Sequence, residues 1–488
     1  MRKAFDQQKR LDCQPVLDVR LNLNCRDEII PILKALQHIY SQPELRDDIL
    51  RAIARDVNHT SSRKRGRQGM DYWQILVLAA VRLGCNLNYD KLQDLAEQHH
   101  ALRQIMGIGD WDEQTTFDWR RIQDNITRIR PETIQRINHL IVAEGHKLVP
   151  QAAETVRADS FVMATNVHYP TESTLICDGL RKILQLCVGL ATLVGAGGWR
   201  QHKHLYNKTK ALARQIDRIA VRKGSGYQQR LKRPYRELLG LADTIVSRAE
   251  KLQKQAQKRT DTEILALGAE LEIFLERTVH VYGTARRRVL QGEKVPNSDK
   301  LFSIFEPHTQ LYKRGKAAEP VQFGRQVLLY EDGAGFITHA CLLPHEADDR
   351  DVVVEQTRIL QRRMKGRIRQ ASFDRGFHSP ENQLQLAKII AHPCLPMPGA
   401  NQARQQEAET TIEFRQARSR HPGIESAIGA LQAGNGLVRC RDRTERGFRR
   451  YIQLGVLGRN LHVLGKLLIA REDATCQAGQ SRRRKAAA

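Results

Sequence analysis

The stretch VRADSFVMATNVHYPTES, residues 156–173, places a single carboxylate, Asp159, within a strand-like run. Val156, Phe161 and Val162 suit a buried β-strand, in which aspartate is disfavoured. An ionised carboxylate in such a place is costly unless a partner neutralises it. These residues allow two partners for the Asp159 carboxylate: a metal ion, or Arg157 in an ion pair at the edge of a sheet.

Composition restricts the class of protein around this stretch. The chain has 488 residues, 41% hydrophobic and 27% charged. That is enough for two to four domains of about 150 residues and is typical of a soluble globular protein. We expect no membrane span, because no run of about 18 apolar residues occurs. The nine cysteines form no C-x-x-C pair, and the N-terminus lacks an apolar leader core, so a reducing cytoplasm is expected.

The charge balance favours a polyanionic partner. The formal net charge is +25, and residues 201–260 alone hold 16 Lys and Arg against 4 Asp and Glu. An excess of this size is typical of proteins that bind nucleic acid. The alternative for residues 201–260 is a solvated helical surface.

The N-terminal region, residues 1–150, is expected to be all helical. A helix is predicted near residues 26–40, then a basic linker at 61–69 and an amphipathic helix closed by Gly84. Three short helices should follow, with a turn at Gly107 and Gly109 and Asp112 as the cap of the third. That third helix carries Arg120 and Arg121, and the group is compatible with a helix-turn-helix that binds DNA. A plain packing or dimerisation module is the alternative.

The remainder alternates strands and helices. Strand patterns cover residues 155–163, 367–373 and 391–396, and residues 321–344 form a β-hairpin pattern. Helix patterns cover residues 349–366, the segment after Ser379, and residues 423–433. Residues 173–290 read as helical, and residues 476–488 as a disordered basic tail. The order predicts an α/β fold with a mixed sheet flanked by helices, interrupted by a helical insertion after the first strand.

Two further acids accompany Asp159. Asp374 follows a strand, where ligand groups of open α/β sheets often lie, and Glu425 falls in the first turn of a helix. Two aspartates on strands and a glutamate on a helix would give oxygen ligands suited to Mg²⁺, and paired ions cleave phosphodiesters. The spacing does not single out these three acids as the metal ligands. Four other acids are alternatives: Asp178, Asp348, Asp349 and Asp351. Glu425 is also explained as an acid favoured at a helix start.

Several stretches resemble DDE transposases of bacterial insertion sequences, in particular an ISNCY-like group. The matching stretches are RADSFVMATNVHYPTESTLICDGLRKI, LFSIFEPHTQLYKRGK, ASFDRGFHSPEN and the segment from HPGIESAIGALQAG to RYIQLGVLGRNLHVLG. They occur in order and span about residues 155–465. The N-terminal helical region resembles the DNA-binding part of such enzymes less specifically.

The resemblance implies a ribonuclease-H-like catalytic domain over 151–172 and 301–475, with a basic helical insertion at 173–300. It implies Asp159, Asp374 and Glu425 as catalytic ligands of two Mg²⁺ ions, with Mn²⁺ as a possible substitute. The implied reaction is cleavage at terminal inverted repeats followed by strand transfer to target DNA. A homodimer or larger synaptic complex, in a bacterial cytoplasm and associated with the nucleoid, is implied with it.

One departure concerns the contact to the DNA phosphate. Such enzymes often carry Tyr and Arg before the glutamate and Lys after it, whereas this chain has His421 one turn before Glu425 and Gln432 seven residues after. His421, Arg418 and Arg439 are therefore the candidates for holding DNA. Two alternatives stay open: a catalytically inert DNA-binding protein derived from a transposase, and a structure-specific nuclease of the same fold.

Overall fold

A computed structural model describes residues 2–5, 11–58, 69–313, 321–397 and 409–486. The chain divides into two compact units, one formed by Met1–Ala164 with Gln326–Ala488 and the other by Thr165–Arg325. The basic linker predicted at 61–69 lies, apart from Gly69, outside the described residues.

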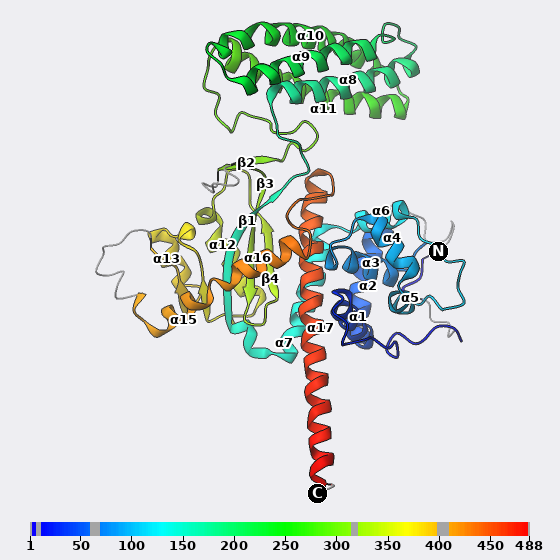
Figure 1. Ribbon diagram of the computed structural model, residues 1–488, viewed down its shortest axis with the longest axis vertical. Coiled ribbons are helices and arrows are strands. Elements are labelled where there is room, and N and C mark those ends of the chain that lie inside the picture. The colour runs from blue at the N-terminus through cyan, green and yellow to red at the C-terminus, as the bar shows by residue number, and fades with distance from the viewer. Residues whose placement is uncertain (1, 6–10, 59–68, 314–320, 398–408, 487–488) are drawn as a thin grey trace. The chain divides into compact units, whose positions relative to one another are not determined.

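Six strands form one open mixed sheet in the order β2-β3-β1-β5-β6, with β4 paired to β3 (Figure 1). Their bounds are β1(Thr155–Ala164), β2(Gln310–Lys313), β3(Val321–Asp332), β4(Ile337–Leu342), β5(Gln370–Ser372) and β6(His392–Cys394). β5 runs parallel to both β1 and β6, whereas β2 and β4 run antiparallel to β3. The predicted α/β class with a mixed sheet is confirmed, and so are the predicted strands and hairpin.

Local signals fix the elements around this sheet. The β3–β4 turn is held by the Asp332 carboxylate, which accepts from the amides of Ala334 and Phe336. The Ser379 hydroxyl accepts from the amide of Asn382 and starts the next helix, as its position before a proline predicted. The helices of this part are α12(Asp349–Arg363), α13(Pro380–Ala387), α15(Ile412–Arg420) and α16(Gly423–Ala433). Of these, α15 was not predicted.

The N-terminal region is helical as predicted. Its helices are α1(Ile29–Ser41), α2(Pro43–Val57), α3(Tyr72–Gly84), α4(Tyr89–Gln98), α5(His100–Ile105), α6(Trp119–Arg128) and α7(Pro131–Leu148). The predicted cap of α6 is wrong: Asp118 caps it, while Asp112 accepts from the amide of Thr115. Residues 106–118 separate α5 from α6, much longer than the turn of three or four residues in a helix-turn-helix.

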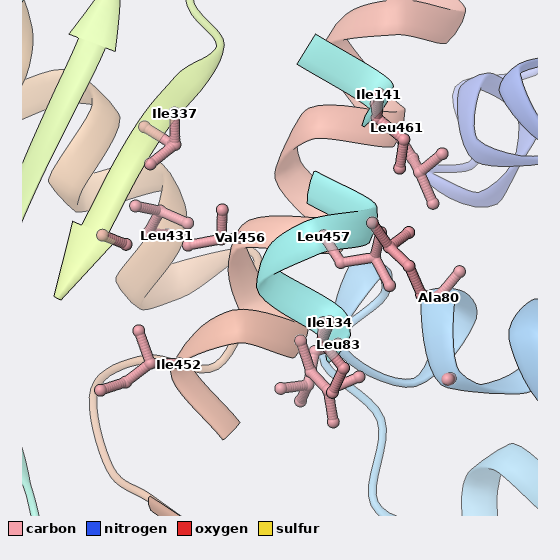
Figure 2. Close-up of a cluster of buried hydrophobic side chains, with 14 of the residues drawn as sticks. Ala80, Leu83, Ile134, Ile141, Ile337, Leu431, Ile452, Val456, Leu457 and Leu461 are labelled. Carbon is pink, nitrogen blue, oxygen red and sulfur yellow. The ribbon is translucent and has the colours of Figure 1, made fainter. Parts of the chain in front are cut away.

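Helix α17(Thr444–Ala486) joins these helices to the sheet. Almost every residue from Tyr451 to Gly465 is buried, with β4 on one side and α3 and α7 on the other (Figure 2). One hydrophobic core therefore extends from α1 to the sheet. The boundary predicted near residue 150 is not a boundary between cores, and α3 is buried all round rather than amphipathic.

Glycines let α17 approach its neighbours closely. A Cβ at Gly458 would lie 2.5 Å from the Cα of Gly84 in α3, and one at Gly465 would lie 1.8 Å from the carbonyl oxygen of Pro31 in α1. Glycine has no Cβ, and for this reason it permits the two backbones to approach this closely. The same helix continues to Ala486, so residues 476–486, predicted to be disordered, form its last turns.

The second unit has a core of its own. It is built from α8(Glu172–Val194), α9(His202–Arg222), α10(Tyr227–Ala256), α11(Thr262–Ala285) and the π-helical turn η2(Arg286–Leu290). These helices pack side by side as a bundle (green in Figure 1), which confirms the prediction of a helical segment at 173–290. None of the described helices in either unit combines the length and apolar character needed to cross a bilayer.

Candidate active site

The register of β1 and β5 indicates that Asp159 and Asp374 lie near each other. β1 pairs with β5 from Thr155 opposite Gln370 to Arg157 opposite Ser372, a constant offset of 215 residues. The paired segment ends there, and Asp159 and Asp374 each follow two residues later, at the same offset. The chain after β5 stays extended, because the Phe373 amide still donates to β6 (3.0 Å, carbonyl of Cys394) and Asp374 has φ −81° and ψ 165°.

Alternation puts both acids on the accessible face of the sheet. Val156 and Ala158 are buried, whereas Arg157 and Asp159 are partly exposed. Side chains two residues apart on a strand share a face, so Asp159 lies on the face of Arg157, and Asp374 on the face of Ser372. Ser160 is on the other face, where its hydroxyl donates to Asp349 of α12 at 2.8 Å.

The corner between α15 and α16, just before Glu425, packs on this face. Arg157 donates to the carbonyl of Arg420 at 2.9 Å, and Nδ1 of the buried His421 lies 3.1 Å from the Ser372 hydroxyl. Helix α16 packs on β1. A Cβ at Gly423 would lie 2.0 Å from Nη1 of Arg157. Because Gly423 has no side chain, the α15–α16 corner can contact Arg157 directly. Gly423 lies two residues before Glu425.

His421 lies within the electric field of two acids and two arginines. Burial lowers the pKa of His421, Arg418 and Arg157 lower it further, and Asp374 and Glu425 oppose this. The net shift is downward, so the imidazole is neutral at pH 7.

The anchor of this corner is a buried ion pair that the sequence did not predict. Arg157 Nε lies 2.6 Å from Glu331 Oε2 in β3, and the Glu331 side chain is 2% exposed. Burial raises the pKa of Glu331, against the opposing effects of Arg157 and Arg459. A pocket of about 540 Å³, lined in part by Arg157, Glu331 and Ser372, opens beside the pair on the same face.

The donor chemistry fits a hard cation. Asp374 and Glu425 are exposed, and within the described part of the chain neither carboxylate has a hydrogen-bond or ion-pair partner. Three carboxylates on one face would supply the oxygen ligands that Mg²⁺ prefers. Across those same residues, however, no three His, Cys, Asp or Glu side chains are already grouped closely enough to hold a metal ion.

The four rival acids have other partners. Asp348 caps α12 and exchanges hydrogen bonds with Asp351 in a capping box. Asp349 accepts from Ser160 and Gln326 on the opposite face of the sheet. Asp178 lies in the second unit, 3.6 Å from His168 and 3.7 Å from Arg181.

The predicted DNA-contacting residues fall into three places. Arg418, half-buried on α15, is near His421, and the exposed Arg439 pairs by an isolated bridge with Ala164, at the end of β1. Arg120 and Arg121 are exposed in the first turn of α6, on the other side of α17 from the sheet (Figure 1). The structure thus places Arg418 and His421 at the corner before Glu425, but it places Arg439 at the other end of β1 and Arg120 and Arg121 on α6.

No protein-family model, no curated protein and no solved structure matches this chain.

Proposed function

We propose that the chain is a DDE transposase that cleaves DNA at the terminal inverted repeats of an insertion sequence and transfers the strand to target DNA. The observation that supports the proposal is the parallel β1–β5 register, whose offset of 215 residues also separates Asp159 from Asp374, together with the α15–α16 corner that contacts Arg157 and Ser372 beside Glu425. We infer a ribonuclease-H-like sheet from the parallel strands β1, β5 and β6 beside the antiparallel pair β3–β4.

In this proposal the three acids hold two Mg²⁺ ions, for which Mn²⁺ can substitute. Such ions, when bound, activate the attacking oxygen and stabilise the leaving oxygen of a phosphodiester. Asp159 and Asp374 are fixed by neighbouring strands, and Glu425 by the corner seated on Arg157. Since His421 is neutral, it can orient a phosphate by hydrogen bonding, and Arg418 and Arg439 supply the positive charge.

The net charge of +25 supports DNA as the substrate. Arg120 and Arg121, exposed on α6, are proposed to contact DNA in the N-terminal region. Because two element ends must be joined, the working form is proposed to be a homodimer or larger synaptic complex, acting at the bacterial nucleoid.

The test is metal-dependent cleavage. Labelled fragments carrying the inverted repeats that flank the gene are incubated with Mg²⁺ and the native chain, Asp159→Asn, Asp374→Asn or Glu425→Gln. Glu381→Gln serves as the control, because Glu381 is an exposed acid of α13 and is not one of the three proposed ligands. The native and control proteins should cut at the repeat boundary, and each acid variant should lose about a thousandfold or more in rate.

Other results would replace the proposal. Binding to the repeats without cutting, by every variant alike, would identify an inert DNA-binding protein. Cutting that depends on the three acids but ignores the repeats and yields no strand transfer would identify a structure-specific nuclease. Cutting that survives Asp159→Asn and Glu425→Gln would reject these acids as the site.

A further inference from the structure

The second unit carries a basic pocket at the end of its helical bundle. The pocket measures about 740 Å³ and lies between the glycine-rich loop after α8 and the end of α10. Four cations line it and no acid does: Arg248, Lys251, Lys258 and Arg259. Within the described chain, none of the four forms an ion pair with a carboxylate.

The cations form a row along one side of the pocket. Arg248, Lys251 and Gln255 are spaced by three and four residues on α10, and side chains at this spacing share a helix face. Lys258 and Arg259 continue the row in the turn after α10. Every charged group of the row is therefore a hydrogen-bond donor. Such a row suits an extended anion rather than a neutral or cationic ligand.

Arg248 is held in place before any ligand binds. Its guanidinium lies 4.9 Å from the centre of the Trp199 ring and donates to the carbonyl of Gly198. Trp199 is 8% exposed and belongs to the bundle core. Since the arginine is already ordered, little side-chain entropy is lost when it meets an anion.

The loop opposite the row is open to a ligand. It reads Gly195-Ala196-Gly197-Gly198, with φ of +74° at Gly195 and +94° at Gly198. A Cβ at Gly197 would meet nothing within 4 Å. An anion can therefore approach the loop backbone without a side chain in the way.

We propose that this pocket binds the phosphodiester backbone of DNA, independently of sequence. The proposal rests on the proposed function only for the choice of DNA as the polyanion. A row of two lysines and two arginines can recognise phosphates without contacting a base edge. The site belongs to the second unit alone and requires none of the three acids.

The sharpest test uses the open position at Gly197. Gly197→Asp and Gly197→Asn add side chains of nearly equal size where there is space, and they differ in charge. Binding of a fluorescein-labelled duplex of arbitrary sequence is followed by anisotropy, with the full chain in EDTA. Asp should weaken binding about tenfold at low salt, whereas Asn should change it less than about twofold.

A second variant measures the number of phosphate contacts. The triple change Lys251→Ala, Lys258→Ala and Arg259→Ala should lower the slope of log K against log salt by about 2 to 3, since each neutralised phosphate contributes about 0.9. The matched control removes three exposed cations of α9, namely Lys203, Lys210 and Arg214. Its slope should change by less than about 1.

Equal effects of Asp and Asn, or equal slopes for the two triple variants, would overturn the pocket as a site. That result would leave the transposase proposal untouched if the native chain still cleaves repeat ends. The opposite result is also informative. If the native chain cuts no DNA, but Gly197→Asp weakens DNA binding and Gly197→Asn does not, the enzyme proposal is rejected and the pocket is retained.

Discussion

Replacing Arg157 with methionine leaves the Glu331 carboxylate buried without its closest partner. The pair has a 2.6 Å contact, and the two side chains are 27% and 2% exposed. Breaking a buried pair by removing one partner costs about 3–5 kcal/mol. Because Arg157 is partly exposed and Arg459 also acts on Glu331, we expect the lower end, about 3 kcal/mol at pH 7.5.

The cost should depend on pH with a definite sign. Burial already raises the pKa of Glu331 above its ordinary value of 4.5, and Arg157 opposes that rise. A carboxyl with a raised folded pKa adds stability that is complete below the unfolded pKa and is lost as pH rises through the folded pKa. Removing Arg157 raises the folded pKa further. The variant should therefore lose stability, relative to the native chain, as pH rises from 4.5 towards neutrality.

Hydrogen–deuterium exchange with increasing urea measures this loss, read from peptides that cover β1 and β3. These peptides report local stability without assuming that both units unfold together. The matched control is the double variant Arg157→Met with Glu331→Gln, which removes the buried charge and should recover most of the loss at pH 7.5. A loss below about 1 kcal/mol, or an equal loss at pH 5 and pH 7.5, would refute this account of the pair.

Three further changes test the fold and the corner. Gly458→Ala should lower the free energy of unfolding by about 1–3 kcal/mol in urea titrations, because its Cβ would lie 2.5 Å from the Cα of Gly84; an unchanged midpoint would contradict this close approach. Leu457→Ala, at a side chain 1% exposed, should cost about 2–5 kcal/mol in the same titration, and a cost typical of a surface residue would contradict the shared core. Gly423→Ala should slow cleavage of repeat ends at least about tenfold while DNA binding is kept, because its Cβ would displace Arg157; full activity would show that the corner does not position the site.

Much of the sheet could be predicted from local patterns. The alternating run that forms β3 and β4, the Ser379–Pro380 helix start and the glycine after α16 each act within a few residues. Turn and cap chemistry is local, so it survives into the folded chain. The three acids could also be proposed from their places on strands and a helix start, although rivals remained.

Tertiary structure alone decided how distant segments combine. The offset of 215 residues that pairs β1 with β5, and the Arg157–Glu331 contact, join residues far apart in the sequence. No periodicity encodes such pairings, because they depend on which faces meet once the core forms. For the same reason the shared core around α17 was missed. Residues 451–465 are buried on nearly all sides, and the sequence does not say which helices will cover them.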